Sequence, residues 1–159
     1  MDTTETLQRT LLVASTVLTG LFAGLFATFT YAVMPGLRRT DDATFVRAMQ
    51  QINAAILNPV FAVVFAGTVV ATVAAVVVGA RDPGPRPWLI ASLVLVLATI
   101  VVTMAVNVPL NDRLSEGTGS PAALREAFES SWVSWNILRS VLSLGGFVAA
   151  VLALAAHTR

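Results

Sequence analysis

Hydrophobic residues gather in four long runs along this chain, and polar residues fill the segments between them. The runs cover about residues 11–34, 59–78, 88–108 and 132–156. Arg139 is the only charged residue within them. A helix rises about 1.5 Å per residue, so about 20 apolar residues cross the hydrocarbon core of a bilayer. The pattern predicts an all-α protein, a four-helix transmembrane bundle that forms a single integral membrane domain over residues 1–159.

Two shorter segments between the runs have the amphipathic pattern of helices that lie at a membrane surface. Residues 41–57 follow Thr40, which suits a helix N-cap, and their apolar residues share one side. Residues 121–131 have the same pattern and precede the fourth run. We therefore expect two short interfacial amphipathic helices, both on the polar side of the bundle.

Prolines near the ends of the first and third runs predict breaks in the helices. Pro35-Gly36 follows the first run, and Pro109 follows the third. Proline removes a backbone donor and collides with the preceding turn, so a helix commonly ends near it. Residues 111–121 then contain two glycines and are predicted to form a loop.

The two halves of the chain have the same order of elements, in which a long run, a polar connection and a short amphipathic segment precede a second run. Phe45 precedes Asn53 by eight residues, and Phe128 precedes Asn136 by the same interval. Duplicated halves of two spans each are parallel repeats, related by an axis along the membrane normal. The order predicts such a parallel two-span repeat, with Asn53 and Asn136 at a similar depth.

Composition limits the chemistry of this chain. Hydrophobic residues make up 56% of it and charged residues 12%, whereas soluble domains are about 25% charged. The net charge of +1 offers no basic surface, so no nucleic-acid partner is expected. Cysteine is absent and the one histidine, His157, lies outside the four runs, which argues against thiolate, haem and histidine–metal sites. We expect neither a bound metal nor a cofactor.

Alternating spans bring polar residues together at one face of the membrane. The end of the first span, the start of the second, the end of the third and the start of the fourth all lie on one side. Candidate site residues occur at these four places, whereas the opposite half of the bundle is almost entirely apolar. They are Tyr31, Asn53, Asn58, Asn107, Asn111, Trp132, Trp135, Asn136 and Arg139.

The site hypothesis depends on Arg139. Its spacing places Arg139 on one helical face with Trp132, Trp135 and Asn136. An arginine at the centre of a membrane helix costs roughly 2.5–3.5 kcal/mol on insertion scales. Its guanidinium must therefore find water, an amide or an anion, or bend back to the surface. We expect Arg139 to point into the bundle. It should lie within hydrogen-bonding reach, directly or through water, of at least one of Asn53, Asn107, Asn111 and Asn136.

Asparagines around one fixed cation suit a flat, partly anionic and otherwise apolar ligand. Trp132 and Trp135 could form the walls of such a pocket, although indoles at an interface are also ordinary membrane anchors. A single asparagine at the end of a span is usually a helix cap or a helix–helix hydrogen bond. The hypothesis therefore rests on the group of residues together.

Several short elements occur in order along the chain. They are Val33-Met34-Pro35-Gly36-Leu37, Gln51-Ile52-Asn53, Asn58-Pro59, Asn107-Val108-Pro109-Leu110-Asn111, and Trp132-x2-Trp135-Asn136-x2-Arg139. With the glycine-bearing first run, they resemble the anthrone-oxygenase-like family of small four-span membrane proteins, most of whose bacterial members have no known function. The resemblance covers roughly residues 11–146.

The resemblance implies oxidation of polyketide anthrones to anthraquinones by molecular oxygen, without an evident cofactor. It implies that the equivalent pocket is lined by Asn53, Asn107, Asn111, Trp135, Asn136 and Arg139, but it transfers no catalytic residue set. From the residues themselves, we expect Arg139 with the amides of Asn136 and Asn107 to be catalytic, as donors that stabilise the enolate oxyanion. The residues expected to bind the substrate are Asn53, Asn58, Asn111, Trp132, Trp135 and Tyr31. No His, Asp or Glu lies within a predicted span, so Tyr31 or an outside carboxylate such as Asp112 must act as the base.

Other functions fit the same sequence. A non-catalytic membrane protein that binds a lipid or an apolar or aromatic small molecule, or that supports a partner complex, is the main alternative. Small-molecule export is a third. The enzyme needs a pocket that contains Arg139, whereas a structural protein needs that region packed solid. The sequence leaves the oligomeric state open.

The expected location is a bacterial cell membrane, with both termini in the cytoplasm. Arginines are denser on the side of the termini and the loop over residues 79–87, which weakly favours that side as cytoplasmic.

Overall fold

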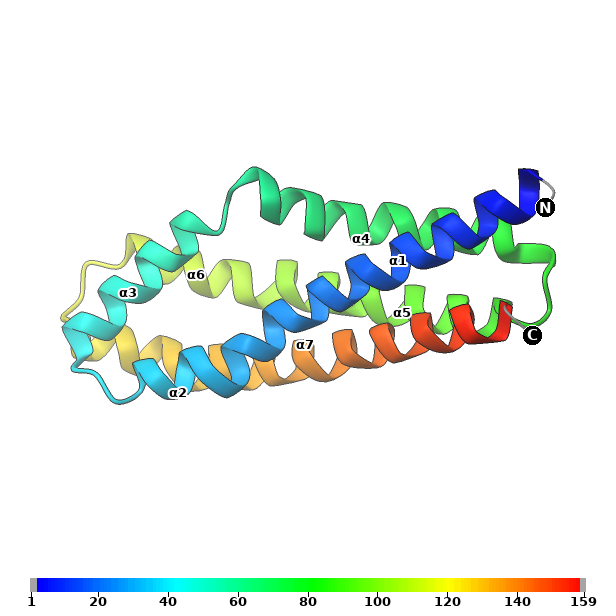
Figure 1. The fold of residues 1–159 in the computed structure, drawn as a ribbon. Helices are drawn as coiled ribbons and strands as arrows, with labels where there is room; N and C mark the ends of the chain where they lie inside the picture. Colours follow the sequence, from blue (N-terminus) through cyan, green and yellow to red (C-terminus); the bar gives the residue numbers. More distant parts are fainter. Residues whose placement is uncertain (1–2, 158–159) are drawn as a thin grey trace.

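The computed structural model describes residues 3–157, which form four helical rods and one short helix at one end of the bundle (Figure 1). The first rod consists of α1 (Thr3–Thr28), η1 (Phe29–Val33) and α2 (Met34–Leu37), and the second rod consists of α4 (Pro59–Val78) and η2 (Gly79–Arg81). The third rod consists of α5 (Arg86–Val102), η3 (Thr103–Asn107) and α6 (Val108–Glu116), and the fourth rod is α7 (Pro121–His157). The short helix is α3 (Asp42–Ala55), which lies between the first and second rods in the sequence. No strand occurs within residues 3–157. All four rods are long and apolar enough to cross a membrane, which confirms the predicted all-α four-helix bundle.

The rods pack in a closed order in which each contacts two neighbours. α1 packs against α4 and α7, and α5 packs against the same two helices. The two chain ends lie at one end of the bundle, and α3 lies at the other end with the α6–α7 connection (Figure 1). α3 packs there against α6 and α7. The four span ends that were expected to share one side do so.

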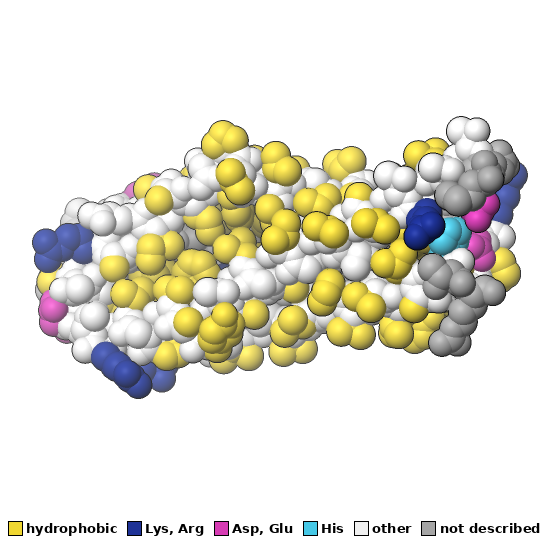
Figure 2. All heavy atoms as spheres, viewed as in Figure 1, with side chains coloured by type: hydrophobic (Ala, Val, Ile, Leu, Met, Phe, Trp, Pro, Cys, Tyr) yellow, Lys and Arg dark blue, Asp and Glu magenta, His cyan; other side chains and the backbone are white. Residues whose placement is uncertain are grey.

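The outer surface of the bundle is hydrophobic along most of its length. Figure 2 shows hydrophobic side chains between two ends where charged side chains gather. On α4, Val60 and Val70 are 74% and 67% exposed, and on α7 Val141 is 62% exposed. A continuous apolar surface of this kind suits lipid rather than water.

The break predicted at Pro35-Gly36 is close, since the first rod ends at Leu37, whereas the break predicted at Pro109 is wrong, since the third rod continues to Glu116. A π-helical segment, η1 or η3, ends two residues before each proline, and the rods continue to Leu37 and Glu116. The amides of Met34 and Val108 bond to carbonyls five residues back, at Phe29 and Thr103. The wider turn gives room to a proline ring that would clash in a regular α-helix.

The expected loop over residues 111–121 is therefore mostly helix, and only residues 117–120 connect α6 to α7. The second predicted amphipathic helix is not separate either. Residues 121–131 are the first turns of α7, which runs unbroken into the fourth span because no proline or cap interrupts it. The parallel repeat stays a prediction: both halves share the π segment before a proline, but only the first half breaks before its second span.

α3 is a separate helix, as expected, but Asp41 rather than Thr40 caps it. The Asp41 carboxylate accepts hydrogen bonds from the Thr44 hydroxyl at 2.6 Å and the Thr44 amide at 3.0 Å. These bonds stabilise the charged form and lower the pKa of Asp41 below its ordinary value. Asn58 and Pro59 then end the connection from α3 and begin α4, because proline fits the first turn of a helix.

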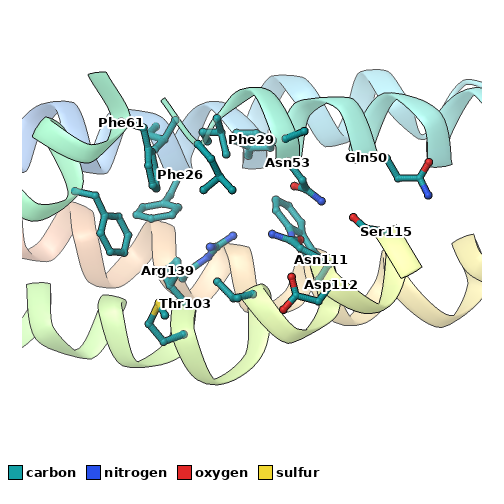
Figure 3. A pocket seen from close by; sticks show the side chains of 18 residues that line it. Phe26, Phe29, Gln50, Asn53, Phe61, Thr103, Asn111, Asp112, Ser115 and Arg139 are labelled. Carbon is teal, nitrogen blue, oxygen red and sulfur yellow. The ribbon is translucent and has the colours of Figure 1, made fainter. Parts of the chain in front are cut away.

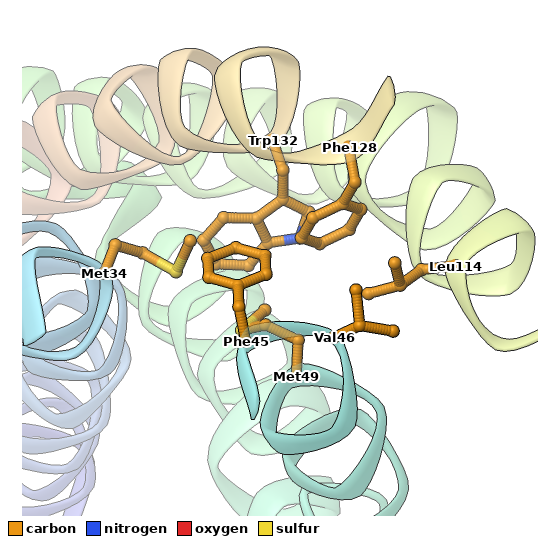
Figure 4. Packing of buried hydrophobic residues seen from close by; sticks show 7 residues of the cluster. All are labelled: Met34, Phe45, Val46, Met49, Leu114, Phe128 and Trp132. Carbon is orange, nitrogen blue, oxygen red and sulfur yellow. The ribbon is translucent and has the colours of Figure 1, made fainter. Parts of the chain in front are cut away.

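Beneath α3 lies a cluster of buried apolar side chains that joins it to the bundle (Figure 4). The cluster consists of Met34, Phe45, Val46, Met49, Leu114, Phe128 and Trp132. Arg125 of α7 packs against the edge of this cluster, and the Arg125 guanidinium carbon lies 4.5 Å from the centre of the Phe45 ring. The same guanidinium bonds to Glu129 at 2.7 Å and Asp42 at 3.1 Å. α3 is thereby held over the end of the bundle where the polar residues converge.

Candidate functional site

A pocket of about 440 Å³ opens at the polar end of the bundle (Figure 3). Its walls come from α1 and η1, the α3–α4 corner, η3 with α6, and α7. The lining residues are Leu25, Phe26, Phe29, Gln50, Asn53, Ala54, Ile56, Leu57, Phe61, Phe65, Thr103, Met104, Val108, Asn111, Asp112, Ser115, Trp132 and Arg139. Aromatic rings and aliphatic side chains dominate the wall, and a few polar groups interrupt it, as in small-molecule sites.

The two π segments help to shape this pocket. Phe29 is the first residue of η1, and Thr103 and Met104 are the first two of η3; all three line the cavity. An extra residue in a turn changes the direction of the side chains that follow, and such bulges are frequent at functional sites. Each π segment that precedes a proline therefore contributes to the pocket wall, although Pro35 and Pro109 do not line it.

Arg139 is buried in α7, with 5% of its surface exposed, and lines the pocket. Its Nη2 donates to Oδ1 of Asn136 at 2.8 Å, which confirms the expected contact with an asparagine. The guanidinium carbon lies 4.6 Å from the centre of the Phe26 ring and 5.2 Å from that of Trp132. These cation–π contacts hold the charge inside the bundle and exclude a side chain that bends back to the surface.

Asn136 connects Arg139 to the first rod. Its Nδ2 donates to the Phe26 carbonyl at 3.1 Å and to the Thr30 hydroxyl at 2.8 Å, while its Oδ1 accepts from Arg139. The Thr30 and Ser140 hydroxyls are 2.8 Å apart. All polar atoms of the Asn136 amide are thus engaged, and the amide positions the guanidinium rather than facing the pocket.

Trp132 is positioned in a similar way by two asparagines. Its indole nitrogen donates to Oδ1 of Asn111 at 2.8 Å, and its backbone carbonyl accepts from Nδ2 of Asn107 at 3.4 Å. Asn107 is fully buried and is not part of the pocket wall, whereas Trp132 and Asn111 line it. Asn107 therefore acts on the site through Trp132.

Three buried side-chain polar atoms lack a hydrogen-bond partner within residues 3–157: Nδ2 of Asn53, Oδ1 of Asn107 and Nε of Arg139. Each such atom costs about 1–3 kcal/mol of desolvation. All three belong to residues expected at the site, and two of these residues line the pocket. The two unpartnered donors, Nδ2 of Asn53 and Nε of Arg139, therefore belong to residues of the pocket wall, although these atoms are themselves buried.

Five of the nine predicted residues lie outside the pocket wall: Asn107 and Asn136, described above, and Tyr31, Trp135 and Asn58. Tyr31 and Trp135 are 72% and 38% exposed on the outer surface. Asn58 caps α4, since its Oδ1 accepts from the Phe61 amide at 3.0 Å and its Nδ2 donates to the Ala55 carbonyl at 2.9 Å. Sequence reasoning also missed lining residues such as Phe26 and Phe61, which carried no signal distinct from other apolar positions in the spans.

Fold and site define the class of protein as a small four-span helical membrane protein with an aromatic pocket around a buried guanidinium. A protein-family model described as anthrone oxygenase matches residues 56–149, more than half of the chain. The chain therefore belongs to the anthrone oxygenase family, which confirms the resemblance found in the sequence. The match includes Arg139, Asn136 and Asp112, but not α1 or α3. No curated protein and no solved structure matches.

Proposed function

We propose that this protein is a cofactor-independent oxygenase that converts an anthrone-like aromatic polyketide into the corresponding anthraquinone. The observation that carries the proposal is the buried Arg139 guanidinium, which lines an aromatic pocket and keeps an unpartnered Nε–H. In the reaction, the substrate methylene is oxidised to a carbonyl and O₂ is the oxidant. One oxygen atom enters the quinone and the other leaves as water.

The pocket suits such a substrate in size and in chemistry. Its volume of about 440 Å³ lies within the usual range for small-molecule sites. Phe29, Phe61 and Phe65 line it and are only half-buried, so a flat ring system can stack on them. Asn53 adds a free Nδ2 donor for a phenol or carbonyl oxygen of the ligand.

Arg139 supplies the electrostatic part of the mechanism. Loss of a methylene proton converts an anthrone into an enolate, whose negative charge rests largely on oxygen. Donors fixed before the reaction stabilise such a developing oxyanion without reorganisation, and this stabilisation commonly contributes more to catalysis than any other effect. Asn136 and the rings of Phe26 and Trp132 fix the guanidinium in place. The electron-rich enolate then reduces O₂.

The same pocket supports the alternative of a binding protein without catalysis. Leu57 and Met104, at 77% and 56% exposed, line the cavity and also face outward, so an apolar ligand or lipid chain can reach it from the side. The open cavity around Arg139 argues against the packed region that a purely structural role requires.

The test uses the purified protein in lipid nanodiscs with anthrone as the probe. We expect anthraquinone to form with one O₂ consumed per quinone, measured by absorbance and an oxygen electrode. Arg139→Ala should lose at least about 100-fold of turnover, whereas Arg47→Ala, which removes an exposed arginine outside the pocket, should not. Saturable binding without turnover would support the non-catalytic alternative.

We also propose that the protein lies in a bacterial cell membrane with both termini in the cytoplasm. The arginine distribution supports this orientation. A cytoplasm-dependent reporter fused after the last residue should be active, and an inactive reporter would reverse the orientation.

A further inference from the structure

Only two of the residues that line the pocket are acids or bases, Asp112 and Arg139. They come from different walls, because Asp112 lies in the second turn of α6 and Arg139 in α7. In Figure 3 both side chains extend from their helices toward the cavity. The continuation of the third rod past Pro109 is what places Asp112 there, since a loop at this position would not hold it against the pocket.

The Asp112 carboxylate is free to react. The ion pairs among residues 3–157 involve Arg38, Arg125 and His157, and none joins Asp112 to Arg139. Asp112 forms no hydrogen bond among the described side chains, whereas the neighbouring Asn111 is bound to Trp132. A carboxylate and a guanidinium therefore share one cavity without neutralising each other, which leaves space for a substrate between them.

We propose that Asp112 is the general base of the reaction, a role that rests on the proposed oxygenase function. A carboxylate oxygen of Asp112 takes a proton from the anthrone methylene. The C–H bond breaks, an O–H bond forms on Asp112, and the electron pair moves through the ring to give the enolate oxyanion beside Arg139. O₂ is then reduced by the enolate as described above. Because Asp112 is exposed at the pocket rim, its proton passes to water.

The other candidate base does not fit this geometry. Tyr31 is 72% exposed and lies outside the pocket wall, so it does not face a substrate that fills the pocket and contacts Arg139. The proton acceptor that the spans themselves lack is thus provided by the helix that extends beyond the third span.

The experiment separates proton abstraction from oxidation. Wild-type protein in nanodiscs is mixed with anthrone in D₂O without oxygen, and exchange of the methylene hydrogens for deuterium is followed by NMR. Quinone formation is measured in a parallel aerobic assay, and anthrone binding by quenching of tryptophan fluorescence. The variants are Asp112→Asn, Asp112→Glu and the matched control Glu116→Gln, an exposed carboxylate on the same helix that does not line the pocket.

We expect Asp112→Asn to lower exchange and turnover by at least about 100-fold while anthrone still binds. Asp112→Glu should recover part of both rates, and Glu116→Gln should match the wild type. Wild-type turnover with an unaffected Asp112→Asn variant overturns the assignment of the base and leaves the oxygenase intact. Loss of anthrone binding in Asp112→Asn also overturns it, because the residue then acts in binding.

Two further outcomes concern the proposed function itself. Deuterium exchange that depends on Asp112, without quinone in air, supports the base and overturns the oxygenase. A wild-type protein that neither exchanges deuterium nor forms quinone overturns both.

Discussion

The two ends of the bundle contain polar side chains in very different situations. At the end around Leu12, Ala75, Leu89 and Ala153, here called the closed end, buried hydroxyls bond to nearby carbonyls. Thr19 donates to the Ser15 carbonyl at 2.7 Å, and Thr72 to the Thr68 carbonyl at 2.7 Å. At the pocket end, Asn53, Asn107 and Arg139 each retain a buried polar atom without a partner.

The two ends differ in unused hydrogen-bonding capacity rather than in polarity. A threonine hydroxyl in a helix reaches the carbonyl one turn back and satisfies itself. An amide or a guanidinium has more donors than one turn of helix can accept, so its partners must come from another element or from a ligand. The bonded hydroxyls of the closed end therefore serve packing, whereas two of the three unpaired groups belong to residues that line the pocket.

Replacing Arg139 with methionine should have the largest effect and should separate function from stability. Turnover should fall by at least about 100-fold because the oxyanion loses its charged donor. The melting temperature should change little, because removal of a buried charge with an unpaired Nε–H offsets the loss of the hydrogen bond to Oδ1 of Asn136. Thr72→Val at the closed end should leave turnover unchanged. A parallel fall of Tm and activity in Arg139→Met would assign Arg139 to packing instead.

Two neighbouring asparagines should respond in opposite ways. Asn53→Leu should weaken anthrone binding by about 1–3 kcal/mol, because its free Nδ2 is lost, without lowering the melting temperature. Asn58→Ala should cost about 1 kcal/mol of stability, because α4 loses its cap, and should leave the dissociation constant unchanged. Titration by tryptophan fluorescence and thermal unfolding in detergent measure both. Equal effects of the two changes on binding and on stability would contradict the assignment of Asn53 to ligand binding and of Asn58 to helix capping.

The two glycines of the first span should also differ, although by less. A Cβ on Gly20 would lie 3.0 Å from Cε2 of Phe147, whereas one on Gly24 meets no atom within 4 Å. Gly24→Ala should gain up to about 1 kcal/mol in helix propensity. Gly20→Ala should gain less or lose stability, because the Phe147 ring must move. Thermal unfolding of the two variants, measured side by side, tests this difference. A Gly20→Ala variant more stable than Gly24→Ala would show that the Phe147 ring moves away at little cost.

The smallest effect is expected for the two aromatic residues on the outer surface. Tyr31→Phe and Trp135→Phe should each keep turnover within about twofold, because neither side chain lines the pocket. Steady-state rates with anthrone check this. A large loss of activity in either variant would restore the sequence-based hypothesis that these side chains contact the substrate.

Much of the site could be predicted because membrane spans must alternate in direction. Alternation places Asn53, Asn111, Trp132 and Arg139 at one end, and all four line the pocket. Helical spacing also placed Asn136 beside Arg139, where the hydrogen bond between them is found. Trp135 shares this sequence pattern but faces outward, because the buried stripe of α7 is narrower than the pattern suggested.

The sequence by itself determined the number of spans and the end of the bundle where polar residues meet, since both follow from the cost of exposing polar groups to lipid. It left open whether Arg139 lies inside the bundle or bends back to the surface, and the structure places it inside. Only the tertiary structure decided which polar side chains face the cavity. That choice depends on the rotation of each helix about its axis, which neighbouring helices and the π segments before Pro35 and Pro109 set. For the same reason Asp112, which follows the third span, lines the pocket, whereas Asn58, which precedes the second span, caps α4.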